Sequence, residues 1–235
     1  MARLGEPRIH HAETGSTNEE ARNLASAGAT HGTLVTADSQ TAGRGRQGRV
    51  WSAPPKSSLL CSLVLREPPN LLPLAAGLAV ADIVAQHGFS AKVKWPNDVL
   101  VDDRKIAGIL AEGRPAEGWA VLGIGINVAT RIEDLPPELH GTAATLGLTS
   151  DDVEEVLGQL LAALEVRLAQ SDGVLLDDFR DRDALLGREV SWSGGVASGV
   201  GAGIDGTGRL IVTTLDGARV LLDAGEVHLG PVASS

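Results

Sequence analysis

Residues 43–49 (Gly-Arg-Gly-Arg-Gln-Gly-Arg) hold three arginines among glycines and no acidic residue. Glycine lets backbone N–H groups approach a ligand closely, and arginine carries forked donors that match phosphate or carboxylate. Gln40 precedes this segment and Trp51 follows it, which adds an amide and a flat surface for stacking a base. The pattern predicts an anion site for a nucleotide. It is not a phosphate-binding P-loop, since no Gly-Lys-Ser/Thr follows. A solvated turn and an arginine–glycine segment that binds RNA are the alternatives.

A second polar segment, residues 94–98, reads Lys-Trp-Pro-Asn-Asp. Pro96 ends a strand and fixes a turn, so Asn97 and Asp98 stand at the end of that strand. Asp98 is a candidate for holding Mg²⁺ or for orienting a neighbouring side chain. Pro-Asn-Asp is also ordinary turn chemistry, and the local pattern by itself favours an Asx-type turn.

Two apolar segments carry isolated residues that can do chemistry. Lys105 opens one of them, and Gly108 follows within it, where a glycine often marks the close approach of a ligand or another backbone. The lysine is either solvated or aims its ammonium at a reacting anion. The other segment contains Gly123, Gly125 and Asn127. It is either a core strand with a bulge or a groove wall along which an aliphatic chain lies, with Asn127 bonding a polar ring.

The elements that must position these residues follow from apolar periodicity. Thr17 and Glu20 have capping-box spacing, which places a helix start at Ser16 or Thr17. The patterns predict helices over 18–27, 71–86, 150–170 and 173–186, and strands over 32–37, 58–65, 91–95, 98–101, 104–111 and 119–128.

From residue 187 the texture changes to short β-runs separated by turn dipeptides, which predicts a small all-β barrel of about five strands over 187–231. The expected fold is α+β, with helices packed on a mixed sheet in residues 1–186 and a β domain in residues 187–235.

Composition limits the possible functions. The 235 residues are 43% hydrophobic, which excludes intrinsic disorder, and the net charge of −10 disfavours a broad nucleic-acid-binding face. The single cysteine, Cys61, excludes a disulfide framework and a cysteine-based zinc site, and is expected to be a buried apolar residue. The six histidines lack the spacing of a helical metal site. Neither a secretory signal nor a membrane-spanning run is visible, so we expect a cytoplasmic protein.

In their order along the chain these segments resemble the biotin protein ligases. The resemblance rests on Ser16-Thr17-Asn18, Gln40 with residues 43–51, Lys94-Trp95-Pro96-Asn97-Asp98, Lys105-Ile106-Ala107-Gly108-Ile109-Leu110 and Gly123-Ile124-Gly125-Ile126-Asn127. The arginine–glycine loop and the Lys-Trp-Pro-Asn-Asp run are highly specific together. The match is strong from Thr14 to Val128 and looser over the β domain, where Gly225-Glu226-Val227 fits.

The resemblance implies a catalytic domain like those of class II aminoacyl-tRNA synthetases and biotin ligases, followed by an SH3-like β-barrel. It implies that biotin reacts with ATP, in the presence of Mg²⁺, to give biotinyl-5′-AMP and pyrophosphate. A lysine of a biotin carboxyl carrier protein, such as that of acetyl-CoA carboxylase, then takes the biotin and releases AMP. The protein would be a monomer or a homodimer.

The resemblance also assigns roles to residues. Lys105 and Arg44 would be catalytic, and Asp98 would assist the metal or the lysine. The residues expected to contact biotin are Ser16, Thr17, Asn18, Gln40, Gly43, Arg44, Lys105, Gly108, Gly123 and Gly125. Those expected to contact ATP or the adenylate are Arg46, Arg49, Trp51 and Asn127.

Two departures from the family pattern matter. Many bacterial members carry an N-terminal winged helix-turn-helix, whereas the catalytic pattern here starts by Glu13, so we expect a monofunctional ligase that binds no DNA. Gly230 and Pro231 stand where members often have a basic residue, so the resemblance does not extend to a direct contact of the β domain with ATP. A lipoate–protein ligase or octanoyltransferase is the nearest alternative, and an RNA-binding module is the alternative from another class.

Overall fold

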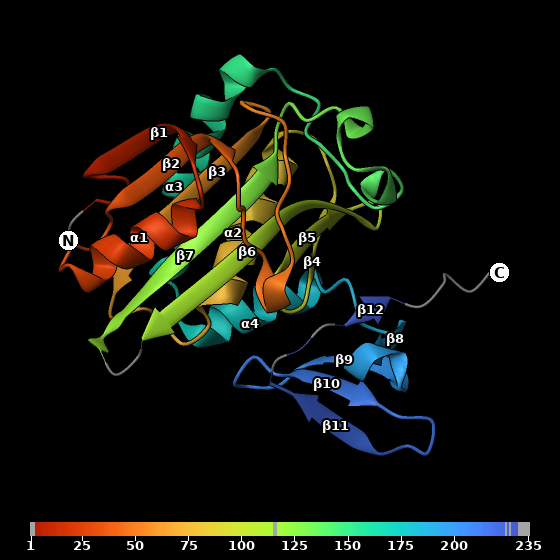
Figure 1. The fold of residues 1–235 in the computed structure, drawn as a ribbon. Helices are drawn as coiled ribbons and strands as arrows, with labels where there is room; N and C mark the ends of the chain where they lie inside the picture. Colours follow the sequence, from red (N-terminus) through yellow and green to blue (C-terminus); the bar gives the residue numbers. More distant parts are fainter. Residues whose placement is uncertain (1–2, 115–116, 224, 226, 230–235) are drawn as a thin grey trace.

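A seven-stranded mixed sheet forms the larger part of the molecule (Figure 1). The computed structural model describes residues 3–114, 117–223, 225 and 227–229. The strands lie in the order β1-β2-β3-β7-β6-β5-β4, with β1 parallel to β2 and the other neighbours antiparallel. Their bounds are β1 Arg8–Thr14, β2 Leu34–Gln40, β3 Ser58–Arg66, β4 Ala91–Lys94, β5 Asp98–Val101, β6 Arg104–Arg114 and β7 Trp119–Asn127.

Helices cover both faces of this sheet. Helix α1 (Thr17–Ser26) packs on β3 and β7 over a small apolar cluster that includes Trp119 and Val121. The apolar helix α2 (Leu72–Gln86) lies on the opposite face, where α3 (Val153–Leu168) and α4 (Asp172–Asp181) pack beside it over the main core (Figure 1). Because side chains alternate along β7, its α1-facing row continues from Val121 to Gly123 and Gly125. The α1 face of β7 therefore loses its bulky side chains beside the start of α1.

The second sheet is antiparallel, in the order β11-β10-β9-β8-β12. Its strands are β8 Glu189–Trp192, β9 Ala197–Ile204, β10 Leu210–Thr213, β11 Arg219–Leu222 and β12 His228–Leu229. This confirms the expected small β domain of five strands, and β11 and β12 form the two edges of the sheet. Of the three matching residues Gly225, Glu226 and Val227, the structure describes Gly225 and Val227. Glu226, Gly230 and Pro231 lie outside the described residues.

Three elements differ from the sequence prediction. Strand β1 was not expected, because its side chains are largely polar and exposed at the edge of the sheet. Helix α4 ends at Asp181 rather than near residue 186, since Asp183 pairs with Val93 of β4 and its Oδ1 accepts the N–H of Leu185. The capping box of α1 does not form: the Thr17 hydroxyl bonds Gln40 instead.

Cys61 is buried in β3 as expected, and burial raises the pKa of its thiol to about 12. In the part of the chain that the structure describes, no helix has the length and apolar character needed to cross a membrane.

Candidate active site

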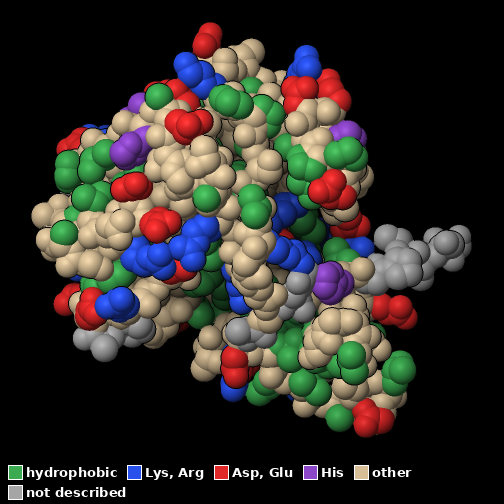
Figure 2. Space-filling model, viewed as in Figure 1, with side chains coloured by type: hydrophobic (Ala, Val, Ile, Leu, Met, Phe, Trp, Pro, Cys, Tyr) green, Lys and Arg blue, Asp and Glu red, His purple; other side chains and the backbone are tan. Residues whose placement is uncertain are grey.

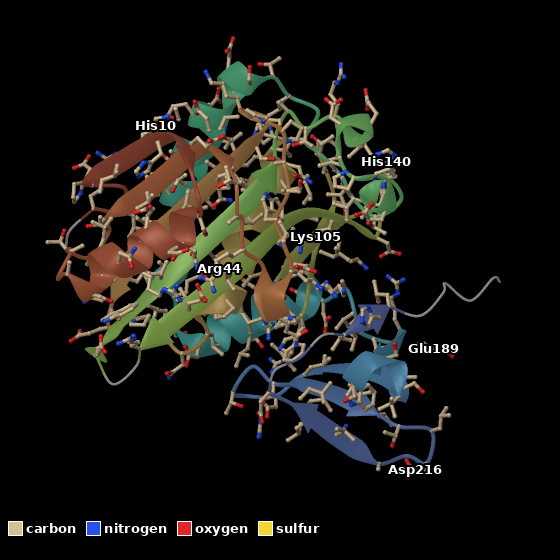
Figure 3. The ribbon with its side chains drawn as sticks, viewed as in Figure 1. His10, Arg44, Lys105, His140, Glu189 and Asp216 are labelled. Carbon is tan, nitrogen blue, oxygen red and sulfur yellow. The ribbon has the colours of Figure 1, made fainter. Side chains whose placement is uncertain are left out.

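A cavity of about 480 Å³ opens where the α1 face of the large sheet meets the arginine–glycine loop and the β domain. This volume is typical of small-molecule sites. Figure 2 shows Lys and Arg side chains gathered along this cleft, whereas Asp and Glu are scattered over the surrounding surface. Arg44 and Lys105 both line the cavity and are labelled in Figure 3. They come from segments about sixty residues apart, which the fold brings to one site.

The arginine–glycine loop is folded back on itself beside the cavity. Arg44 forms an antiparallel bridge with Val50, and the N–H of Gly45 donates to the carbonyl of Arg49 at 2.8 Å. Arg46 reaches across to the second polar segment, where its Nη1 donates to Asn97 Oδ1 at 3.5 Å. Burial lowers the pKa of Arg46, and the charge of Asp98 opposes this effect. The loop thus carries its guanidinium groups to one wall of the cavity.

Lys105 is held at the start of β6 by backbone and side-chain contacts. Its N–H donates to the Thr142 carbonyl at 2.7 Å, and its carbonyl accepts the N–H of Ala144 at 2.8 Å. Its Nζ lies 2.6 Å from Asp98 Oδ1 and 5.7 Å from the centre of the Trp51 ring. The Asp98 side chain is only 15% exposed, so this ion pair is partly shielded from water. The pair fixes an ammonium group at the cavity wall.

Lys94 is a cation of this wall that the sequence reasoning did not assign a role. Its side chain lines the cavity beside Lys105 and Asp98. Burial lowers the pKa of Lys94, Asp98 raises it, and the positive charges of Lys105 and Arg49 lower it further. One end of the cavity therefore concentrates several positive charges around the carboxylate of Asp98, which suits a ligand with several negative charges.

The opposite end of the cavity carries a neutral polar network at the start of α1. Gln40 Oε1 accepts the N–H and the hydroxyl of Thr17 at 2.8 and 3.1 Å. Ser62 Oγ donates to Thr17 Oγ1 at 2.9 Å and to Asn18 Oδ1 at 3.1 Å. The hydroxyl of Ser16, which is 2% exposed, has no hydrogen-bond partner among the described residues. A buried polar group without a partner is costly, so this end fits a ligand with neutral polar atoms.

The glycines of β7 leave space that other side chains of the chain enter. A Cβ atom at Gly123 would lie 2.3 Å from Asn18 Oδ1, and one at Gly125 would lie 2.6 Å from Trp51 Cε2. Any larger residue would therefore displace Asn18 or the indole ring. One of the two interpretations of this segment places an aliphatic ligand over these glycines, whereas in this structure Asn18 and Trp51 lie there. Gly108 is similar, since its Cβ would lie 3.1 Å from Lys105 Nζ.

Comparison with known proteins shows the family of this chain. Residues 12–128 match the model of the biotin/lipoate A/B protein ligase family. A biotin–[acetyl-CoA-carboxylase] ligase of Mycobacterium tuberculosis is 36% identical over 236 residues, covering 93% of this chain and 87% of that protein. A ligase of the same description from Paracoccus denitrificans is 35% identical, covering 93% of this chain and 99% of its own.

The chain belongs to the biotin/lipoate A/B protein ligase family. Among solved structures, the biotin protein ligase of Aquifex aeolicus in complex with biotin and ATP superposes with a TM-score of 0.81 at 29% identity, covering 96% of this chain and 99% of that one. The α+β fold of the catalytic part and the small C-terminal β domain are thereby confirmed as the fold of a biotin protein ligase.

The structure brings together every sequence-predicted site residue of this ligase except Gly43 along the cavity. The lining includes Ser16, Thr17, Asn18, Gln40, Arg44, Arg46, Arg49, Trp51, Asp98, Lys105, Gly108, Gly123, Gly125 and Asn127. Gly43 lies behind the wall, where its Cβ would be 2.4 Å from the Trp51 carbonyl and its own carbonyl accepts the Trp51 N–H at 3.0 Å. Because Gly43 has no side chain, the backbone at the base of the loop can come this close to Trp51.

Asn127 lines the cavity, but its amide is used within the ligase itself. Its Nδ2 donates to the Ala144 carbonyl at 2.9 Å, and its Oδ1 accepts the Ser58 hydroxyl at 3.4 Å. The sequence pattern assigned this amide to the nucleotide. In the structure it holds the segment that also carries the backbone partners of Lys105.

Sequence reasoning also missed residues that no local motif marks. Glu112 accepts a hydrogen bond from Asn18 Nδ2 at 2.6 Å, although 94 positions separate them. Leu135, Leu139 and His228 line the cavity from the segment after β7 and from the β domain. Of these residues, only Glu112 could have been found from the sequence, because alternation along the strand places it on the same face of β6 as Gly108.

The residues offer little for a metal by themselves. No group of three or more His, Cys, Asp or Glu side chains that could hold an ion occurs in the described residues. Asp98 contributes one carboxylate at the cationic end of the cavity, next to Lys105. One carboxylate fits a Mg²⁺ ion that keeps its waters and takes its other ligands from substrate phosphates.

Proposed function

We propose that this chain activates biotin with ATP as biotinyl-5′-AMP, releasing pyrophosphate. It then transfers biotin to a lysine of a biotin carboxyl carrier protein, such as that of acetyl-CoA carboxylase. The observation that carries the proposal is the two-ended cavity. A neutral polar network at the start of α1 faces a cluster of cations around Lys105 and Lys94. A ligand with a neutral polar head and a terminal carboxylate spans the two ends, and it brings its carboxylate to the cations.

In the first step, a carboxylate oxygen of biotin attacks the α-phosphorus of ATP, and the bond to the β-phosphate oxygen breaks. Both reactants are anions, so their approach and the charge of the transition state must be neutralised. Lys105 would contact both the carboxylate and the α-phosphate, with Asp98 holding its ammonium in place. Arg46 and Arg49 would bind the phosphates, and Trp51 the adenine side. Asp98 would be a residue that holds Mg²⁺, which would neutralise the phosphate charge.

In the second step, the neutral amine of a carrier lysine attacks the acyl carbon of the mixed anhydride, the bond to AMP breaks, and the amine loses a proton. The adenylate must be kept from water until the carrier arrives. Arg44 and the rest of the loop 43–51 would cover it, since residues of this loop line the cavity. Ser16, Thr17, Asn18 and Gln40 would hold the ring of biotin.

The proposal is tested by incubating the purified protein with ATP and either biotin or lipoate and measuring the release of pyrophosphate. Pyrophosphate release driven by biotin supports it, and release driven by lipoate alone would make the chain a lipoate–protein ligase instead. Addition of a biotin carboxyl carrier domain should then give one biotin per acceptor lysine by mass spectrometry. That the protein is a monomer or homodimer, binds no DNA and is cytoplasmic stays a prediction. So does the division into separate domains at residues 186 and 187.

A further inference from the structure

A side-chain hydrogen bond joins the Lys94–Asp98 segment to the β domain. Trp95 stands within the Lys94–Asp98 segment and is 3% exposed. Its indole Nε1 donates to the carbonyl of Gly208 at 2.9 Å. Gly208 belongs to the turn between β9 and β10, 113 positions further along the chain. The indole therefore spans the boundary between the two sheets.

The turn that offers this carbonyl is held by the side chain of Asp205. Its Oδ1 accepts the N–H of Thr207 at 2.9 Å and that of Arg209 at 3.0 Å, and its Oδ2 accepts Arg209 Nε at 2.8 Å. Loss of hydration disfavours the ionised carboxyl, but these hydrogen bonds outweigh it and hold the pKa of Asp205 well below its usual range. The turn is therefore fixed in shape at neutral pH.

The same turn is pressed against the start of α2. Gly208 has a φ of +81°, and a Cβ there would lie 2.7 Å from Leu71 Cδ2 and 3.2 Å from Leu74 Cδ1. A left-handed backbone with no room for a side chain leaves the carbonyl of Gly208 little freedom to move away from Trp95. The contact thus has a rigid partner on each side.

On the catalytic side, Asn97 and Asp98 follow Trp95 within three positions, and both contact residues that line the cavity. Asn97 Nδ2 donates to the Ile109 carbonyl of β6 at 2.9 Å, and its N–H donates to the carbonyl of Lys94 at 3.2 Å. Asp98 holds Lys105 at 2.6 Å. A displacement of the indole would therefore shift Lys94, Asp98 and Lys105 as one group. Ser16, Thr17 and Gln40 stand on other elements.

We propose that the Asp205–Arg209 turn of the β domain, through the hydrogen bond from Trp95 to Gly208, positions the cationic half of the active site. Trp95 and Asp205 are positioning residues in this proposal, since they act through Lys94, Asp98 and Lys105. The β domain thus contributes to adenylate formation from a turn that need not touch the nucleotide. This inference rests on the function proposed above.

The test replaces Trp95 by phenylalanine, which removes the N–H donor and keeps an aromatic ring, and separately replaces Asp205 by asparagine. We expect kcat/KM for ATP in biotin-dependent pyrophosphate exchange to fall about five- to tenfold in each variant. Trp95→Phe loses the hydrogen bond to Gly208, and Asp205→Asn loses the oxygen that accepts Arg209 Nε and holds the turn. The affinity for biotin alone, measured by calorimetry, should fall less than kcat/KM for ATP, because Ser16, Thr17 and Gln40 would still hold the ring of biotin. The double variant should be no worse than the single ones, because both act on one contact.

Trp192→Phe is the matched control, because Trp192 is a tryptophan of the β domain in β8. It should leave both measurements unchanged. Unaltered exchange in Trp95→Phe and Asp205→Asn would overturn the inference, as would an equal loss of biotin affinity, which means general loosening. If Trp95→Phe does not fold, Asp205→Asn decides alone. Absence of biotin-dependent exchange in the starting protein would instead overturn the proposed function, and the inference with it.

Discussion

Replacement of Lys105 by alanine separates an active-site lysine from a lysine that is merely solvated at the start of a strand. The substitution removes the ammonium that lies 2.6 Å from Asp98 Oδ1 and lines the cavity. A fixed positive group at the reacting oxygens of an acyl or phosphoryl transfer is worth about 100- to 1,000-fold in rate. We therefore expect adenylate formation by Lys105→Ala to fall by about that factor.

The stability of the protein should change much less. The Lys105 side chain is 35% exposed, so solvent screens its ion pair, and such pairs contribute about 1 kcal/mol or less. For a chain of this length, that amounts to a shift of about 2–4 °C in Tm. Lys105→Ala should keep its fold and its Tm within this range, while its chemistry is lost.

Biotin-dependent pyrophosphate release from ATP measures the chemistry, and thermal unfolding measures the fold. Lys92→Ala is the matched control, because Lys92 is also a strand lysine but is exposed on β4. It should turn over like the starting protein. Turnover by Lys105→Ala within threefold of the control would refute the assignment. A fall in Tm well beyond the expected range would refute the argument that the pair contributes little to folding.

Three other predictions follow from the structure. Arg44→Ala should still form the adenylate but lose it to water, so AMP should accumulate without a carrier faster than in the starting protein. Gly125→Ala places a methyl group 2.6 Å from the Trp51 ring, so urea unfolding should show a loss of about 1–3 kcal/mol, with weaker biotin binding by calorimetry. Burial disfavours ionised Asp82, but hydrogen bonds from Arg167 and Arg182 keep its pKa below the usual 3.8. The stability it contributes is therefore present above pH 3.8 and lost as the pH falls through the lowered pKa. Asp82→Asn should cost about 2 kcal/mol at pH 7, and urea unfolding at pH 3 should show a smaller difference.

The segments that carry the site could be predicted because each is short and its chemistry is local. The arginine–glycine loop, the Lys94–Asp98 run and the glycines of β7 are all read from neighbouring residues. The apolar strands and the helix α2 were predicted to within three residues at each end for the same reason, since burial imposes a regular apolar pattern.

The remaining features depend on contacts between distant positions. Strand β1 is polar and is a strand because β2 offers it a partner, and helix α4 stops because Asp183 pairs with β4. The hydrogen bond from Asn18 to Glu112 and that from Trp95 to Gly208 join residues that no local window contains. For such residues the sequence shows the residue type but not the partner.

The site also had to be distinguished from an RNA-binding surface, and the distribution of charge makes that distinction. The chain has a net charge of −10, yet the cations of the cavity lie close enough that Lys105 and Arg49 lower the pKa of Lys94. An extended nucleic acid would have to cross the surface around the cleft, over which Asp and Glu are scattered, and the net negative charge of the chain repels its phosphates. A small polyanion that enters the cavity reaches its cations, and it relieves the repulsion between them. The geometry therefore selects a nucleotide over a nucleic acid, although both carry phosphates that arginine can bind.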